Sequence, residues 1–513
     1  MRQVAITAVL AVLAVCGCDA VFGLHDRHAG DAAGGDGAGP DGPSGPTALA
    51  TIVEVTIPNG SNDAPEAAQT RALGSDRVTA TATLDDGTAV TPRFTADGDL
   101  AIPLHATGGG YALSLVIDDD VPRVFVSSAA HLTIADELVG RTRTAIEQAT
   151  PLTITAGGGY QFANGDTVFV DSTGIWSSSL PTSGLVSNST VFGLNWGSAS
   201  TLSGPIGALD GTLDDTLALA VTHDTNDGYT AIQNFGTTTA IEMTDGQPSQ
   251  ATIAVASTNP LPSTCFTLTA DISSPLVRLG SDYGSDGNPT PASDWIVTAS
   301  GGATFSATVG LPLAVSTMSA NAHGVKLVNP FAGTSTTISL GGELTGALAI
   351  PGRTPLSLGP SLRVFDAVTA SPGCASSPAL TLDITGIALP SHASIGGVTP
   401  TTQGQSLTLD PAVGQPVAWT ALDSGRVDAY QSVLFELVPG AASAESLVER
   451  IRFVTTGTTV TIPPGVLEAG HFYTVEVIAL SGLPGAASGD FETSVLPLGF
   501  ASSVTPAFLV EPP

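Results

Sequence analysis

Beyond position 48 the chain repeats one pattern, in which short alternating runs of apolar and polar residues are separated by turn-forming residues. Val78–Leu84 (VTATATL) and Tyr111–Ile117 (YALSLVI) alternate with period two, the side-chain period of a β-strand. The first run leads into Asp85-Asp86-Gly87, a hairpin-type turn. Charged residues make up only 12% of the chain, and 59 glycines and 36 prolines interrupt it, a composition that disfavours helices. The sequence therefore predicts an all-β chain of several β-sandwiches.

Shifts in composition and clusters of turn residues divide the chain. We expect a signal segment at 1–17, a disordered tether at 18–48, and β domains at 49–150, 151–260, 261–395 and 396–513. Within this plan, Glu137 to Thr150 is the best candidate for a helix or a connector. No fixed-period repeat stands out, so a propeller is not expected.

The first residues have the order of a secretory signal. Arg2 supplies a positive charge, and Val4–Val15 is an uncharged apolar run that is too short to span a bilayer as a helix. The run ends in Val15-Cys16-Gly17-Cys18, which resembles the bacterial lipobox. That resemblance implies cleavage before Cys18 and acylation of its sulfur with palmitate-type chains, and two or more such chains anchor a protein stably.

Two other interpretations of this region stay open. The segment is also compatible with an ordinary secretory signal that is cut further on, or with a Cys-x-Cys metal or redox pair with His25 and His28 nearby. The tether at 18–48 is rich in glycine and aspartate and cannot bury a core; its aspartates serve as solvated charge or, alternatively, bind a cation. Together with the arginine bias of the chain, these features resemble surface lipoproteins of myxobacteria and similar bacteria, which implies a lipid-anchored position at the cell envelope, in the outer membrane or at the cell surface.

The last domain has the clearest pattern. Trp419 lies in one short strand-like run, Tyr430 begins another, and Leu467 precedes Tyr473 by six residues. This pattern resembles a fibronectin type III domain with a tyrosine corner, in which the tyrosine hydroxyl bonds to the backbone a few residues upstream. The resemblance implies that all four residues belong to the core. The segment from Ala441 to Arg452 departs from the family because its composition is partly helical.

The first β domain contains the segments LDDGTAV, GDLAIPL and GGGYALSLVID. This pattern resembles carboxypeptidase-regulatory-like and bacterial Ig-like modules. Such modules are usually structural, so the resemblance implies no activity for this part of the chain.

Apart from Cys16 in the signal segment and the candidate lipidation residue Cys18, the sequence contains two cysteines, Cys265 and Cys374. In an oxidising compartment we expect them to form a disulfide, which would close a loop of about a hundred residues and stabilise the fold by about 4–5 kcal/mol. The alternative is two separate buried thiols.

Charge limits the partners. The formal net charge is −31, and such a field repels phosphate backbones, so nucleic acid is not an expected partner. We expect contact with the membrane through the N-terminal lipid and with an unidentified protein or glycan ligand. Trp176, Trp196 and Trp295 are candidates for a glycan platform, with core packing as the alternative for each.

Catalytic motifs are missing from the sequence. It contains no Gly-x-Ser-x-Gly elbow, His-Glu-x-x-His, P-loop or dinucleotide fingerprint, and we assign no catalytic residue. Six histidines are scattered along the β domains, and none of these six has a second histidine at ligand spacing: His105, His131, His223, His323, His392 and His471. The favoured function is therefore a non-catalytic structural, adhesive or ligand-binding one.

Two other functions remain alternatives. A surface hydrolase would have its site in residues 151–394, where His223 or His323 would meet an acid and a hydroxyl. A calcium-stabilised adhesin would use Asp224, Asn226 and Asp227, which offer oxygen ligands at short spacing before a glycine. A second acidic turn follows at 280–288. Calcium is the one cofactor that the sequence suggests, and an aspartate- and asparagine-rich turn without metal is the competing interpretation for both segments.

Overall fold

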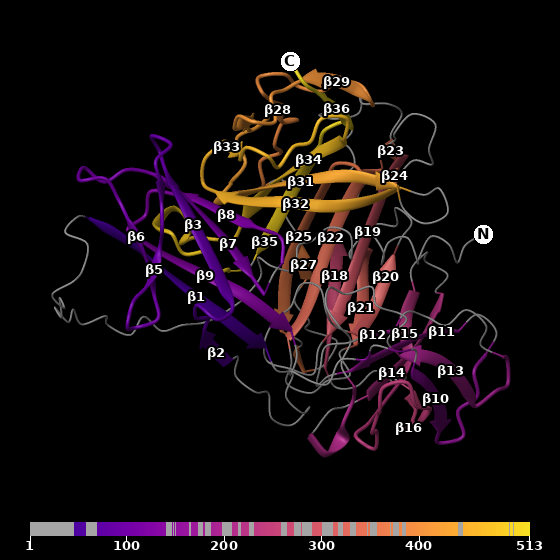
Figure 1. Cartoon of the computed structure of the whole chain (residues 1–513). Helices are drawn as coiled ribbons and strands as arrows, with labels where there is room; N and C mark the ends of the chain where they lie inside the picture. The colour runs from indigo at the N-terminus through magenta and orange to yellow at the C-terminus, as the bar shows by residue number, and fades with distance from the viewer. Residues whose placement is uncertain are drawn as a thin grey trace.

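The computed structural model is nearly all β (Figure 1). It describes residues 46–57, 69–118, 120–139, 146, 148, 150–163, 166–172, 178–179, 186–196, 208–213, 217–224, 230–257, 264–270, 279, 290–299, 311–316, 322–328, 335–345, 347–348, 356–369, 371–372, 379–381, 386–439, 445–491, 493–495 and 497–513. The predicted signal segment, the lipidation site Cys18 and the part of the tether before residue 46 lie outside these residues. Among the residues that the structure describes, no helix has the length and apolarity that a membrane span requires.

Residues 46–139, called the first module, form a two-layered β-sandwich. One sheet has the order β2-β1-β6-β5 with β9 parallel to β1, and the other contains β4, β3, β7 and β8. The bounds are β1 Thr47–Ile57, β2 Gln69–Ala72, β3 Val78–Leu84, β4 Ala89–Val90, β5 Arg93–Phe94, β6 Leu100–Pro103, β7 Tyr111–Ile117, β8 Arg123–Ser127 and β9 His131–Val139. The predicted strands at 78–84 and 111–117 are confirmed residue by residue, because their alternation matches the burial of every second side chain.

The expected helix or connector at Glu137 to Thr150 is wrong at both ends. Glu137 to Val139 belong to β9, where Glu137 lies in register with Val55 and Val139 with Ile57, and Thr150 begins β10. The helix-favouring composition of this stretch is overridden by pairing with β1 along the whole length of β9. Most of the intervening residues lie outside the described part of the chain.

Residues 150–257, called the second module, pack β13-β10-β16 against β11 and β14, and β15 pairs with β14. The bounds are β10 Thr150–Gly157, β11 Thr167–Ser172, β12 Ser178–Ser179, β13 Val191–Trp196, β14 Leu217–Asp224, β15 Thr230–Thr238, β16 Ser249–Ala254 and β17 Ala256–Ser257. Trp196 is only 1% exposed and belongs to this core. It is therefore a packing residue and not a glycan platform; Trp176 lies outside the described residues.

Residues 264–381, called the third region, contribute β20, β19, β22 and β25 as neighbouring antiparallel strands. A separate small sheet joins β21, β18, β26 and β27. The bounds are β18 Thr264–Ala270, β19 Thr290–Ala299, β20 Leu311–Ser316, β21 Ala322–Val328, β22 Ser335–Thr345, β23 Ala347–Leu348, β24 Leu356–Ser357, β25 Ser361–Thr369, β26 Ser371–Pro372 and β27 Ala379–Thr381. Trp295 is placed here by its backbone, in β19.

Residues 386–513, called the last module, form the sandwich that the fibronectin type III resemblance predicts. The sheet β28-β30-β33 faces a sheet in which β32, β31, β34 and β35 are neighbours. The bounds are β28 Ser394–Ile395, β29 Gln405–Thr408, β30 Gln415–Ala418, β31 Ala429–Pro439, β32 Glu445–Thr455, β33 Thr459–Ile462, β34 Phe472–Ser481, β35 Leu498–Val504 and β36 Phe508–Glu511. The partly helical composition of 441–452 is misleading, since residues 445–452 lie in β32.

The tyrosine corner is present. The hydroxyl of Tyr473 accepts a hydrogen bond of 3.0 Å from the backbone N–H of Glu468, while its ring is fully buried. Trp419 and Tyr430 pack edge to face with ring centroids 5.5 Å apart, and Leu467 is 2% exposed. The prediction that these four residues form the core is confirmed.

The modules are joined edge to edge by backbone hydrogen bonds. β8 of the first module pairs in parallel with β32, and β25 of the third region pairs antiparallel with β35 on the opposite edge of the last module's sheet. A short pairing of β15 with β20 connects the second module to the third region. One continuous sheet therefore runs through all four parts of the described chain, as the neighbouring ribbons of Figure 1 show.

The first and last modules also share one hydrophobic core. Ile52, Leu115 and Ile134 of the first module belong to the same buried cluster as Ile478 and Phe500 of the last. The rings of Phe125 and Phe491 meet across this junction at 5.8 Å. The two ends of the described chain thus form one packed body.

Replacing Tyr473 tests the tyrosine corner. Tyr473→Phe keeps the ring and removes the hydroxyl that Glu468 needs, so we expect a loss of about 1 kcal/mol in the free energy of unfolding, measured by denaturant titration. Tyr430→Phe is the matched control, because the role of Tyr430 is the contact of its ring with Trp419. An equal loss in both variants would contradict a special role of the corner.

The disulfide stays a prediction, because Cys374 lies outside the described residues. Cys265 is in register with Ser371 in the pairing of β18 with β26. Cys374 follows Ser371 by three residues, and three residues of extended chain span at most about 11 Å. We expect non-reducing peptide mapping of protein produced in an oxidising compartment to find Cys265 linked to Cys374, and Cys265→Ala to lower the melting temperature. Two free thiols in protein produced this way would refute the bond.

Candidate functional site

The turn between β3 and β4 holds two neighbouring carboxylates outward. Leu84 and Thr88 close the turn with a 2.9 Å backbone hydrogen bond, and Gly87 takes the left-handed conformation (φ 86°) that the turn requires. Asp86 Oδ1 accepts from the N–H of Thr88 at 2.8 Å, and Asp85 Oδ2 accepts from the N–H of Gly110 at 3.2 Å. Both side chains are consequently fixed at the end of the first module.

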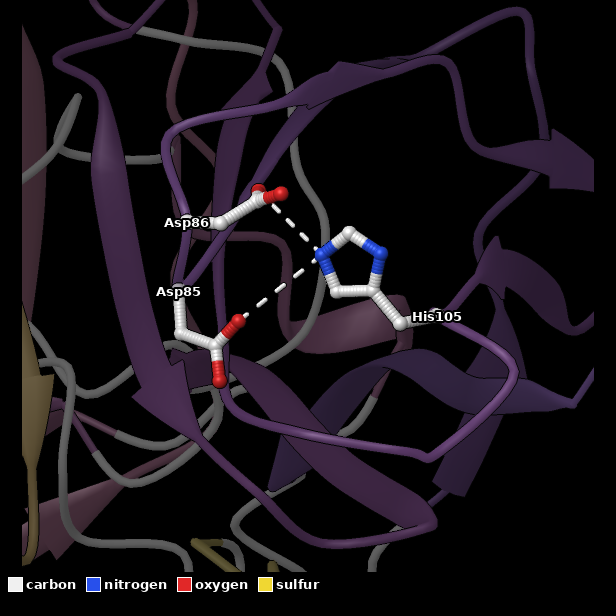
Figure 2. A group of neighbouring side chains, drawn as sticks. All are labelled: Asp85, Asp86 and His105. Atoms are coloured by element: carbon white, nitrogen blue, oxygen red, sulfur yellow. Dashed lines mark ion pairs between the residues drawn. The ribbon is translucent and has the colours of Figure 1, made fainter.

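His105 points into this pair of carboxylates (Figure 2). It follows β6, and its Nε2 lies 3.1 Å from Asp86 Oδ1 and 3.8 Å from Asp85 Oδ1. The pKa of Asp86 is lowered, first by the hydrogen bond from the Thr88 backbone and then by the Thr88 hydroxyl and by His105. Because Asp86 is exposed, solvent screens these interactions.

The donor set of this cluster suits a transition metal better than calcium. One imidazole nitrogen and two carboxylate oxygens lie within 4.8 Å of one another. A tetrahedral zinc ion with ligand bonds of about 2.1 Å needs donor atoms about 3.4 Å apart. The distances from His105 Nε2 to the two carboxylate oxygens, 3.1 and 3.8 Å, lie on either side of that value. Calcium prefers six to eight oxygen ligands. The same contacts also describe a His–Asp ion pair that fastens the turn to the loop after β6.

Sequence reasoning missed this cluster. His105 stands among the scattered histidines, and Asp85-Asp86-Gly87 indicates only a turn. The two segments meet because β3 and β6 belong to facing sheets of one sandwich, and nothing local in the sequence specifies that contact.

A second cluster bears on the hydrolase alternative. His223 Nδ1 lies 3.5 Å from Asp166 Oδ1, so His223 does meet an acid. The hydroxyl of the cluster belongs to Tyr160, which donates to Asp166 Oδ2 at 2.9 Å and not to the histidine. Burial and the neighbouring Asp166 both raise the pKa of Tyr160 well above its usual value, so the phenol stays protonated. This geometry is that of a hydrogen-bonded support for the loop at 160–166 and not of an activated nucleophile.

The predicted calcium ligands are not brought together in the described part of the chain. Asp224 is the last residue of β14, in register with Thr230, and Asn226 and Asp227 lie outside the described residues, as does the acidic turn at 280–288. His323 is placed by its backbone in β21. Calcium binding at 224–227 stays a prediction.

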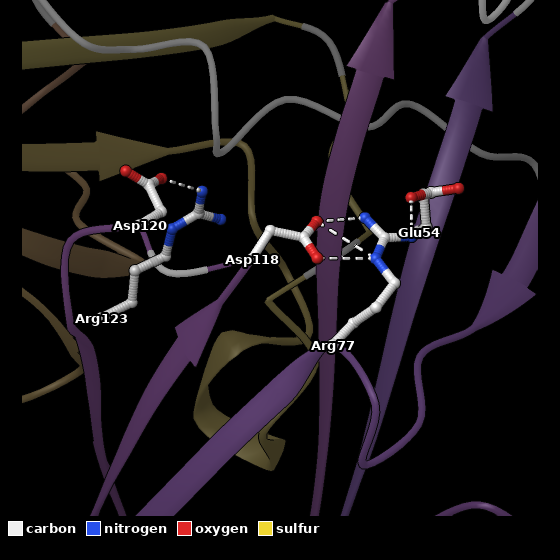
Figure 3. A network of polar contacts seen from close by, with 5 residues as sticks. All are labelled: Glu54, Arg77, Asp118, Asp120 and Arg123. Atoms are coloured by element: carbon white, nitrogen blue, oxygen red, sulfur yellow. Dashed lines mark hydrogen bonds and ion pairs between the residues drawn. The ribbon is translucent and has the colours of Figure 1, made fainter.

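Two further charged networks hold strands in place. Arg77 forms ion pairs with Glu54 on β1 and with Asp118 after β7, and these interactions raise the pKa of its guanidinium (Figure 3). Asp118 has a positive φ of 51°, so the bidentate contact secures an unusual backbone conformation. Beside it, Arg123 lies 3.5 Å from Asp120.

In the last module, the carboxylate of Glu436 is only 4% exposed. It lies 2.7 Å from Nδ1 of His471 and accepts from Arg450 at 2.5 Å. Each partner comes from a different strand or loop, which indicates a structural role.

Comparisons with known proteins give little beyond the fold. No family model matches the chain, and no curated protein matches it. Among solved structures, the chain is similar to the N-terminal four Ig domains of Dscam1 isoform 8.4, with 10% identity, coverage of 91% of this chain and 98% of that chain, and a TM-score of 0.12. It is also similar to the FN1–FN3 domains of chicken CNTN1, with 9% identity, coverage of 71% and 97%, and a TM-score of 0.13. At these TM-scores the likeness carries no argument about this chain, and the description of the last module depends on its own tyrosine corner and strand order.

Proposed function

We propose that this chain is a lipid-anchored protein of the cell envelope with a structural or adhesive role, in which a rigid assembly of β modules presents a surface to a protein or glycan ligand. The observation that carries the proposal is the continuous sheet that joins the modules at both edges of the last one. The anchor itself is supported by the lipobox resemblance at Cys18.

Modules in a chain usually move relative to one another unless their interface is large and hydrophobic. Here the first and last modules share a buried cluster and four register pairs between β8 and β32. The module that follows the tether is therefore coupled directly to the module at the other end of the described chain. Such coupling suits a passive scaffold, whose task is to hold a surface in a fixed orientation at a distance from the membrane.

Charge defines which ligands this scaffold is suited to. A formal net charge of −31 opposes binding of nucleic acid and of anionic head groups. The negative electrostatic field of the chain does not repel a ligand with a neutral or cationic surface, whether that ligand is a protein or a glycan.

Substitution of Phe491 tests the coupling of the modules. Phe491 is 7% exposed and contacts Phe125 across the junction, so Phe491→Ala should cost about 3 kcal/mol of unfolding free energy. Hydrogen exchange followed by mass spectrometry should show protection lost in both the first and the last module. Leu422→Ala, at a site that is 45% exposed, is the control and should change stability by less than about 0.5 kcal/mol. Loss of protection confined to the last module would contradict the shared core.

The anchor is tested by expressing the full chain in a bacterium with two membranes. Intact mass spectrometry of the membrane-extracted protein should show removal of 1–17 and the added mass of acyl chains on Cys18. Cys18→Ser should abolish both changes, while Cys16→Ser should leave both intact because Cys16 leaves with the signal segment. Acylated protein from Cys18→Ser, or an unmodified wild-type chain, would refute the anchor and leave the module coupling untouched.

A further inference from the structure

A buried carboxyl group lies where the last module meets the third region. Glu476 is on β34, the central strand of the sheet, and is 4% exposed. It is in register with Val433 of β31 and Val504 of β35. Directly opposite residues in antiparallel strands share a face, so Glu476 lies on the face opposite to the fibronectin-type core that Tyr473, Val475 and Val477 build.

In an isolated sandwich this face would meet water, but here other parts of the chain cover it. On one side of Glu476, Ile478 packs into the core shared with the first module. On the other side, Val504 packs with Leu348 and Leu356 of the third region. The carboxyl is therefore enclosed by the docking of neighbouring parts and not by its own module.

The polar contacts of Glu476 lead directly to the junction. Its side chain bonds to Ser502 on β35. The Ser502 hydroxyl in turn lies 2.9 Å from the Ser361 hydroxyl and accepts from the Ser361 backbone N–H at 3.2 Å. Ser361 begins β25, whose pairing with β35 comprises five residue pairs, so a chain of hydrogen bonds connects the carboxyl to the third region.

The charged groups around Glu476 do not neutralise it fully. Arg452 on β32 is a cation whose charge lowers the pKa of Glu476, but it makes two hydrogen bonds of 2.8 and 2.7 Å to Glu449. Arg123 on β8 is in register with Arg452. The third region contributes two charged residues on neighbouring strands, Arg363 on β25 and Glu343 on β22, and Glu343 is in register with Ser361. Burial raises the pKa of Glu476 to about 7; Ser502 and Arg452 lower it and Glu449 raises it.

We infer that Glu476 makes the junction between β25 and β35 sensitive to pH: the strands stay closed while the carboxyl is protonated and part more readily once it ionises. An ionised carboxylate gains solvation when water reaches it. The five-pair ladder between β25 and β35 is shorter than the nine-pair ladder between β34 and β31, so the junction opens before the module itself does.

Proton linkage gives the direction in which the stability of this junction changes with pH. The folded-state pKa of about 7 lies above the ordinary value of 4.5, so the closed state holds the proton more tightly. The stabilisation is complete below about pH 4.5 and is lost as the pH rises through 7. Between pH 5 and pH 8 the opening constant should rise by up to about 70-fold.

Hydrogen exchange of the full chain tests this inference. Peptides that cover 361–365 and 498–502 should lose protection between pH 5 and pH 8 after correction for intrinsic exchange, whereas peptides of β10 in the second module should not. Glu476→Gln, which keeps the shape and removes the charge, should abolish the pH dependence. Glu468→Gln, an exposed carboxyl of the same module, should retain it.

Two further variants separate a specific switch from general destabilisation. Glu449→Gln removes a neighbouring negative charge and should move the transition to lower pH. Ser502→Ala removes a hydrogen bond to the carboxylate and should move it to higher pH. If the junction of the Glu476→Gln protein still opens with the same pH profile as the wild type, the inference is overturned.

Discussion

Backbone pairing between modules is the constraint on which the rest of this structure depends. The sheet of the last module has two edges, and both are occupied, by β8 in parallel and by β25 in antiparallel orientation. An open edge offers unpaired N–H and C=O groups to any other chain. Here Arg452–Thr455 of β32 and Leu498–Ser502 of β35 are paired within the molecule. The same pairings place the shared core around Phe125 and Phe491 and turn the outer face of the last module into an interior surface.

This interior surface explains the polar groups that it contains. Gln431, Arg452 and Glu476 occupy positions that an isolated sandwich exposes, and each is buried or nearly so. Burying polar groups is costly unless their hydrogen bonds are satisfied. Arg452 is satisfied by Glu449, whereas Glu476 depends on a serine and on its own proton. The junction around Glu476 therefore responds to the pH of the solution, whereas the hydrophobic cluster that the described residues form on the other face contains no such carboxyl group.

The sequence predicts the parts of this fold that are encoded locally. Val78–Leu84 and Tyr111–Ile117 are strands because their alternation matches one buried face, and the spacing of Leu467 and Tyr473 indicates the corner that the hydroxyl of Tyr473 makes. The junctions have no such signal, since Arg123 and Arg452 come from opposite ends of the chain. For the same reason, neither the approach of His105 to Asp86 nor the burial of Glu476 follows from the pattern around each residue. Alternation places Glu476 on the outer side of β34, and only the docking of other modules encloses it.

The parallel pairing of β8 with β32 also sets an order of events during folding. Contacts between residues far apart in the chain are slow to form, because the loop between them must close first. The outer edge of β8 stays unpaired until the last module has been synthesised and folded. Until then the first module carries an open, partly apolar strand edge that can pair with other chains. How long this edge stays exposed depends on how quickly β32 becomes available to pair with it.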